Sequence, residues 1–183
     1  VTVDVTGDLL DENGETYLVN LTAVTAGTAA GGPGIGTITD DDAVVFSIDS
    51  VAVTEGNAGT TNAAFTVTRD HASDHTVTVS YATAPDTLGA NAATGGGTDH
   101  ADVGLTSVAF LSTDPLTRTV NVAVTGDLLD ENTETFLVNL SGASAGTTIS
   151  PIDGTGTGTI NDDDATPTVS INDIAINPEG TAA

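Results

Sequence analysis

The chain has 183 residues and a formal net charge of −24, with two arginines and no lysine. Nothing here can neutralise phosphates, so nucleic acid and anionic membrane surfaces are excluded as partners. No apolar run approaches the roughly 18 residues of a membrane span, so we expect no membrane insertion. Cysteine is absent, and without lysine no lysine–asparagine isopeptide bond can form. Any internal crosslink must therefore be a metal ion.

The first 42 residues have a close counterpart later in the chain. The run VTGDLLDEN at residues 5–13 recurs unchanged at residues 124–132, about 120 residues later. The segments that follow also return in similar form, 15–21 at 134–140 and 36–42 at 158–164. A period of this length is too long for a solenoid and is typical of tandem whole domains.

We therefore expect three segments. Residues 1–42 are the C-terminal strands of a partial repeat, and residues 44–164 are one complete repeat. Residues 167–183 are the first strand of a following repeat, because Ser170-Ile171 and Glu179-Gly180 match Ser47-Ile48 and Glu55-Gly56. This arrangement indicates a longer array of such domains.

Apolar residues alternate with polar ones along the complete repeat, the pattern of half-buried strands. A one-residue break between Phe46/Ile48 and Val51/Val53 predicts a bulge in the first strand. Six further strands are expected around Phe65/Val67, Val77/Val79/Tyr81, Val108/Phe110, Val120/Val122/Val124, Phe136/Val138/Leu140 and Ile160. Seven strands separated by Gly, Asp, Asn and Pro clusters, with no helical stretch, predict an all-β antiparallel sandwich.

The acidic residues are of an unusual kind. Twenty are Asp and six are Glu, and the Asp residues cluster at 8–11, 40–42, 127–130 and 162–164. A solvated helical face would favour Glu, whereas Asp prefers turns and oxygen-rich metal sites. Surface acidity of the halophile type is the alternative, and it predicts dispersed charge. The clustering therefore favours metal ligation.

Strand order places many of these carboxylates together. In a seven-stranded antiparallel domain the first, third and fifth connections and the end of the last strand lie at one end. Those segments carry Glu55, Asp99, Asp127, Asp130, Glu131, Glu134, Asp162, Asp163 and Asp164. Two carboxylates about 4 Å apart repel by about 4 kcal/mol at an effective dielectric of 20, so such a cluster requires cations. Many oxygen ligands on flexible loops suit Ca²⁺, and their number indicates two or more ions.

The complete repeat resembles the Calx-beta domain, a sandwich found in the regulatory loop of sodium/calcium exchangers, in integrin β4 and in large bacterial surface proteins. The resemblance rests on VTEG at 53–56, FTVT at 65–68, VTVSYAT at 77–83, TDH at 98–100, the run 124–136 and GTINDDD at 158–164. It implies a Greek-key immunoglobulin-like fold. It also implies calcium ligation by Glu55, Asp99, Asp127, Glu131, Glu134 and Asp162 to Asp164, with the backbone carbonyl of Leu129.

The partial repeat carries its own half-set of the same residues: Asp8, Asp11, Glu12, Glu15, Asp40, Asp41 and Asp42. Only two or three residues separate Asp42 from the next strand, so calcium would make this linker rigid. Loops at the opposite end of each repeat would then lie against the acidic end of the preceding repeat. Asp70 and Asp74 lie in such a loop, either as outer-shell ligands or in a plain solvated turn.

The three histidines do not predict a metal site. His71 and His75 flank one loop, and His100 lies at the opposite end, about 20 Å away. A three-histidine site is therefore excluded, and we expect ordinary surface histidines. No Asp cluster fits the EF-hand spacing. No Ser lies in a nucleophile-elbow motif, so Ser/His/Asp catalysis has no support and we expect no enzymatic activity.

Three functions remain open. The first is a structural repeat of an extracellular bacterial adhesin or surface filament, whose partners are adjacent repeats and neighbouring copies. The second is a calcium sensor that changes the angle between repeats, as the exchanger resemblance implies. The third is a non-catalytic module of a secreted enzyme.

Overall fold

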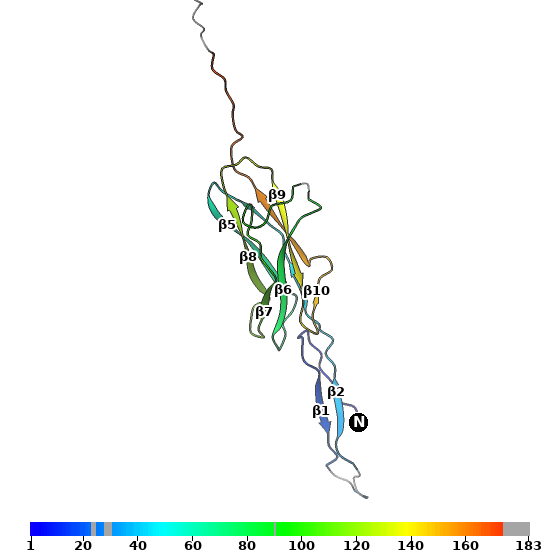
Figure 1. Ribbon diagram of the computed structural model, residues 1–183. Coiled ribbons are helices and arrows are strands. Elements are labelled where there is room, and N and C mark those ends of the chain that lie inside the picture. Colours follow the sequence, from blue (N-terminus) through cyan, green and yellow to red (C-terminus); the bar gives the residue numbers. More distant parts are fainter. Residues whose placement is uncertain (23–24, 28–30, 90, 174–183) are drawn as a thin grey trace, which may run out of the picture.

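The computed structural model describes residues 1–22, 25–27, 31–89 and 91–173. Most of these residues form a sandwich of two β-sheets, and a two-stranded hairpin extends from one end of it (Figure 1). The chain after residue 164 leaves from the opposite end. Residues 165–173 form no strand. The rest of the strand predicted at 167–183, including its Glu179-Gly180 motif, lies outside the described residues.

The first sheet has the order β10-β3-β5-β8. Its strands are β3 (Val45–Ile48), β5 (Gly59–Arg69), β8 (Thr117–Gly126) and the short β10 (Thr148–Ile149). The long antiparallel pair β5–β8 forms its centre, from Gly59 opposite Gly126 to Thr68 opposite Thr117. β10 pairs with β3 in parallel.

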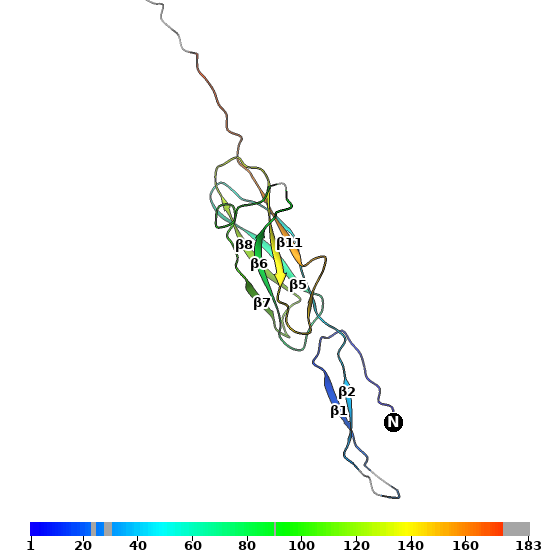
Figure 2. The same cartoon turned by 45° about the vertical axis from the view of Figure 1, so that its right-hand side comes forward.

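The second sheet has the order β4-β11-β9-β6-β7 and packs against the first, as the turned view shows (Figure 2). Its strands are β4 (Val51–Thr54), β6 (Val77–Pro85), β7 (Thr106–Phe110), β9 (Glu134–Ser141) and β11 (Thr155–Asn161). β11 pairs antiparallel with β9 and parallel with β4. The end of β4 and the end of β11 are therefore at the same end of the sandwich.

The core lies between the sheets and consists of the alternating apolar residues. Val77 and Val79 of β6 and Val122 and Val124 of β8 are fully buried, while the residues between them are more exposed. Four phenylalanines fill the centre, and Phe65 meets Phe136 edge to face across the two sheets at 5.9 Å. The all-β sandwich expected from the alternation is confirmed.

The predicted bulge in the first strand is wrong, because the break transfers the chain between sheets. β3 pairs with β5 in one sheet, whereas β4 pairs with β11 in the other. The two residues at the break bind both sheets: Asp49 Oδ1 accepts a hydrogen bond from the Thr66 amide, and Ser50 Oγ accepts one from the Thr157 amide. The parallel pairings of β3 and β4 follow from this division, so the sandwich is not purely antiparallel.

The hairpin consists of β1 (Glu15–Val19) and β2 (Gly34–Ile38). Tyr17 lies opposite Gly36, and in the sandwich Phe136 of β9 lies opposite Gly158 of β11 in the same way. The hairpin therefore has the register of the β9–β11 pair. The part of the chain that the structure describes has no helix long and apolar enough to cross a membrane.

Candidate metal centre

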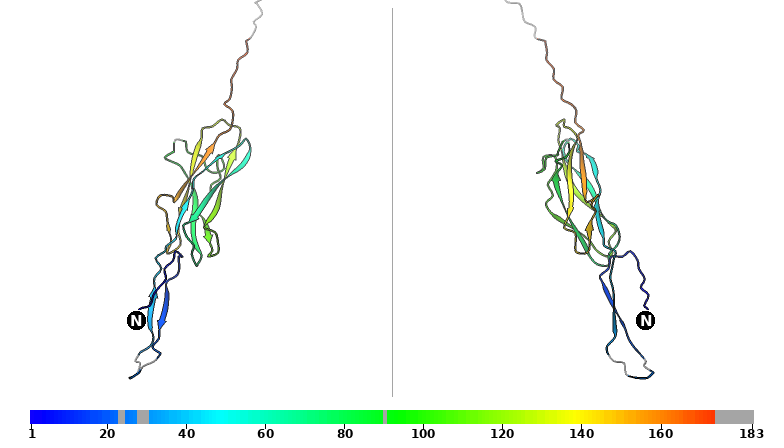
Figure 3. Two further views of the ribbon diagram at one scale, coloured as in Figure 1. Left: turned by 180° about the vertical axis from the view of Figure 1, so that it is seen from behind. Right: turned by 90° about the vertical axis from the view of Figure 1, so that its right-hand side faces the viewer.

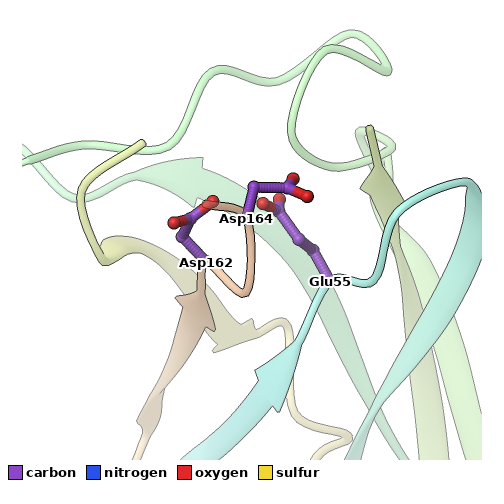
Figure 4. A group of neighbouring side chains, drawn as sticks. All are labelled: Glu55, Asp162 and Asp164. Carbon is purple, nitrogen blue, oxygen red and sulfur yellow. The ribbon is translucent and has the colours of Figure 1, made fainter. Parts of the chain in front are cut away.

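Three carboxylates converge at the end of the sandwich where β4 and β11 terminate. Glu55 follows β4, and Asp162 and Asp164 follow β11, whose parallel pairing aligns Asn161 with Thr54. One carboxylate oxygen from each of the three lies within 4.8 Å of the others. Figure 4 shows the three carboxylates gathered at this end, with Glu55 directed toward Asp164.

Four more acidic side chains surround this group. Asp127 and Glu131 lie in the loop after β8, Glu134 begins β9, and Asp99 lies in the loop between β6 and β7. Gly126, at the end of β8, lets the chain there approach the segment after β4 closely, because a Cβ on Gly126 would be 2.0 Å from the carbonyl oxygen of Gly56. The seven residues that we call the tip cluster are Glu55, Asp99, Asp127, Glu131, Glu134, Asp162 and Asp164.

Burial, together with the crowding of negative charge, raises the pKa of three glutamates. Burial, followed by the charges of Glu131, Asp127, Asp162 and Asp164, raises the pKa of Glu55 to about 7. Burial and a hydrogen bond with Asp99 raise the pKa of Glu134 to about 7. The pKa of Glu131 is also raised, by burial and then by Asp99 and Asp127. Without a cation, full ionisation of the tip cluster is therefore unfavourable.

Several oxygens of the tip cluster lack a protein partner. Glu55 Oε1, Asp162 Oδ1 and Asp164 Oδ2 are buried and accept no hydrogen bond from the described residues. A buried carboxylate oxygen without a partner loses its hydration without compensation. A cation would supply that compensation. Oxygen donors from four segments of the chain, without sulfur or imidazole, fit Ca²⁺ in number and chemistry.

His100 was predicted to be an ordinary surface histidine, and this is wrong. It is 2% exposed, and its ring stacks on Phe136 with centroids 4.4 Å apart. The backbone on either side is held by β8, since the Thr125 amide donates to the Asp99 carbonyl and the Ala101 amide donates to the Ala123 carbonyl. The stacking on Phe136 and these backbone hydrogen bonds together hold the neighbouring Asp99 at the tip cluster. Burial of an imidazole on a phenylalanine is not visible in a single sequence.

The other predicted ligands at this end are exposed residues of the surrounding loops. Asp163 is exposed, and its Oδ1 accepts a hydrogen bond from the Gly56 amide at 3.0 Å. Asp130 and Leu129 are exposed on the loop after β8, and the Leu129 amide donates to Asp127 Oδ1 at 2.7 Å. Asn57, which the sequence reasoning missed, donates from its side chain to Asp164. These contacts organise the loops around the tip cluster.

Comparison with known proteins gives a family. Residues 38–164 match the Calx-beta domain. This chain belongs to the Calx-beta domain family. No curated protein sequence matches it at a significant level.

Solved structures agree with this fold. A crystal structure of CBD12 from CALX1.2 has 21% sequence identity and a TM-score of 0.54, over 66% of this chain and 44% of that one. The calcium binding domain CBD12 of CALX1.1 has 21% identity and a TM-score of 0.53, over 65% of this chain and 46% of that one. The apo form of the Calx CBD1 domain has 22% identity and a TM-score of 0.51, over 66% of this chain and 98% of that one. The chain therefore spans less than half of the two CBD12 chains and nearly all of the CBD1 domain.

A second group of acidic residues lies where the hairpin meets the Calx-beta domain. Asp8, Glu12, Asp40, Asp41 and Asp42 line a cavity of about 120 Å³, and Glu15 starts β1 nearby. Burial and then the charges of Asp8, Glu15, Asp74 and Asp40 raise the pKa of Glu12. Burial and the neighbouring Asp41 and Asp40 raise the pKa of Asp42. We call these six residues the hairpin cluster.

The hairpin segment is joined to the Calx-beta domain by the loop at residues 70–75, which we call the basal loop. The Asp11 amide donates to the Ala72 carbonyl at 3.1 Å, and the Asp74 amide donates to the Asp11 carbonyl at 3.0 Å. His71 Nε2 lies 2.8 Å from the Asp42 carbonyl oxygen. Asp70 accepts a hydrogen bond from the Val45 amide, so it supports the start of β3. Figure 3 shows this joint from two further sides.

Proposed function

We propose that this chain is a calcium-binding structural module, in which Ca²⁺ stabilises each Calx-beta domain and stiffens its joint with the next. The observation that carries the proposal is the tip cluster, with three buried carboxylate oxygens that have no partner among the described residues. Glu55, Asp162 and Asp164 would hold an ion first. Asp99, Asp127, Glu131 and Glu134 would complete its shell and take up a second ion.

The protein's own residues prepare this end for a cation. Backbone amides position two of the aspartates, since Gly56 donates to Asp163 and Leu129 donates to Asp127. Mutual repulsion of the remaining carboxylates would be relieved on binding, so the ion would contribute folding free energy. At one hundred times the dissociation constant, ligand binding stabilises a domain by about 2.7 kcal/mol.

The joint supports a role in a tandem array. The acidic hairpin repeats the sequence and the strand register of the β9–β11 end, and Asp11, in the segment before β1, contacts the basal loop through backbone hydrogen bonds. If the tip cluster contacts the basal loop of a following domain in the same way, calcium would order each linker. We therefore propose a stalk of tandem Calx-beta repeats in an extracellular bacterial adhesin or surface filament, non-catalytic in itself.

The experiment is thermal unfolding of this chain across a calcium titration, with chelator and magnesium as controls. Circular dichroism suits a chain without tryptophan. A calcium-specific rise in Tm with a midpoint near 0.1–1 mM, the range of extracellular modules, is expected. A midpoint near 1 μM would favour a calcium sensor instead. No calcium effect, with stability restored by salt alone, would contradict the proposal.

A further inference from the structure

Asp11 is buried at the joint, although its counterpart in the complete repeat is not. The two residues occupy the same place in the repeated run, yet Asp11 is 4% exposed and Asp130 is exposed on its loop. The difference comes from the basal loop, which holds Asp11 by backbone hydrogen bonds to Ala72 and Asp74. The contact thus removes one carboxylate from water.

One oxygen of the Asp11 carboxylate has no hydrogen bond within the described part of the chain. Its Oδ2 is buried and has no donor among the described residues. The nearest ring nitrogen is His75 Nε2, at 3.6 Å. This separation is too long for a hydrogen bond, which requires about 2.7–3.2 Å for a nitrogen donor.

The other nitrogen of His75 determines what faces Asp11. His75 Nδ1 lies 2.6 Å from Asp74 Oδ1 and 3.1 Å from Ser73 Oγ. A carboxylate only accepts hydrogen bonds, so Nδ1 carries the proton in the neutral ring. The Nε2 lone pair then points at a carboxylate oxygen. His75 is about one-third exposed and Asp11 is buried, and two acceptors that face each other in this way need either a second proton on the ring or a metal ion between them.

The geometry matches a metal ion with nitrogen and oxygen ligands. Ligand bonds of 2.0–2.1 Å at a tetrahedral angle place two ligand atoms about 3.4 Å apart, close to the separation of Asp11 Oδ2 and His75 Nε2. Metal-binding histidines donate their second ring N–H to a carboxylate, as His75 does to Asp74. Imidazole suits zinc and similar ions, whereas calcium takes oxygen ligands.

The surroundings have room for further ligands. Asp11 and His75 line a cavity of about 330 Å³ together with Glu12, Asp40 and Asp41. No third acidic or histidine ligand of the described residues forms a close group with this pair, so water from the cavity would complete the shell. Residues of both the hairpin segment and the Calx-beta domain line the cavity, so an ion bound there would connect the two.

We propose that Asp11 and His75 form a site for a borderline divalent ion of the zinc type, which locks the hairpin to the basal loop. This site differs from the tip cluster in position and in ligand chemistry. It does not depend on calcium binding there. Asp74 is a positioning residue that orients the ring of His75.

The test is a zinc titration of the whole chain with ¹⁵N-labelled histidine, in buffer that contains saturating calcium. Calcium occupies the oxygen-rich sites, which would otherwise bind zinc weakly. The chain has three histidines, so each imidazole can be followed separately by NMR. We expect the Nε2 resonance of His75 to move on binding, with those of His71 and His100 unchanged, and Tm to rise with zinc.

Matched variants identify the ligands. Asp11→Asn keeps the backbone contacts to the basal loop and should weaken zinc binding at least tenfold, whereas Asp130→Asn should leave it unchanged. His75→Gln should abolish the response, and Asp74→Asn should weaken it 10–100-fold. His71→Gln is the imidazole control, because both ring nitrogens of His71 already face the Asp42 carbonyl and the Asp70 carboxylate.

Two outcomes would overturn the proposal. The first is an unchanged His75 resonance at zinc concentrations that saturate ordinary surface sites, which would mean that a protonated imidazole balances Asp11. The second is an equal response in wild type and Asp11→Asn. Neither outcome would affect the calcium proposal, which is read from the calcium titration without zinc.

Discussion

The ring of Phe136 lies directly over Gly158 on the neighbouring strand, where a Cβ would be 2.3 Å from Phe136 Cζ. The ring also stacks on His100. Phe136 thereby connects the core to the tip cluster, because Asp99 precedes His100 and Glu134 lies two residues before the ring. Tyr17 and Gly36 have the same relationship in the hairpin, where a Cβ on Gly36 would be 2.2 Å from Tyr17 Cζ.

Gly158→Ala should therefore destabilise the Calx-beta domain. The added methyl group requires the Phe136 ring to move, and overpacking of this kind costs about 1–3 kcal/mol. Gly104→Ala is the matched control, since nothing lies within 4 Å of a Cβ there. Chemical denaturation in saturating calcium measures both. Equal free energies of unfolding for the two variants would show that the Phe136 ring moves aside without destabilising the domain.

Glu55→Gln should separate calcium binding from stability. Removing one buried charge from the tip cluster lowers the repulsion between carboxylates. We therefore expect the free energy of unfolding of the calcium-free chain to rise by about 1–2 kcal/mol, which is less than the ~4 kcal/mol of repulsion between two unit charges 4 Å apart. The calcium-dependent rise in Tm should shrink or disappear, because an amide is a weaker ligand. Asp153→Asn, an exposed acid, should leave the calcium response intact. A Glu55→Gln chain with the full calcium response would contradict the assignment of Glu55.

Acidification should stabilise the calcium-free chain. Glu55 and Glu134 have a folded-state pKa of about 7, against 4.5 when unfolded. Between these values the folded chain binds more protons, so the free energy of unfolding falls as pH rises toward 7. One pKa unit corresponds to about 1.4 kcal/mol, and we expect Tm to drop by at least about 4 °C from pH 5 to pH 8 in EDTA.

Saturating calcium should reduce or reverse that trend, because calcium binds the ionised carboxylates and its affinity rises with pH. The Glu55→Gln/Glu134→Gln double variant should lose most of the pH dependence in EDTA. Thermal melts at several pH values, with and without calcium, give both comparisons. A calcium-free Tm that rises from pH 5 to pH 8 is the contrary result.

The two arginines should differ in their contribution to stability. Arg69 is fully buried, donates to the Leu111 and Asp114 carbonyls and lies over the Phe110 ring at 5.5 Å. Arg69→Met takes the donor from the Asp114 carbonyl, whereas the Leu111 carbonyl keeps the Asp114 amide, and the loss should cost about 1–3 kcal/mol. Arg118 pairs with the Asp114 carboxylate nearer the surface, so Arg118→Met should cost about 1 kcal/mol or less. Denaturation of both variants in calcium would test the difference, and equal losses would disprove it.

The strands and the placement of several acidic residues at one end of the sandwich could be predicted from local sequence patterns. Period-two alternation predicted the strands, and the parity of their connections predicted that Glu55, Asp99, Glu134 and Asp162 share one end. These inferences succeed because the alternation of apolar and polar residues is a local pattern, and successive strands joined by loops reverse direction along the chain. Composition likewise excluded cysteine and lysine crosslinks.

Tertiary structure decided what depends on contacts between distant segments. The transfer at Asp49 and Ser50 depends on the amides of Thr66 and Thr157, one in each sheet. His100 is buried because Phe136, on another strand, offers its ring face. Asp11 and Asp130 stand in identical local sequence, and only the basal loop buries one of them. Identical residues thus acquire different chemistry, because burial and the partners of a side chain are set by the chain that packs against it.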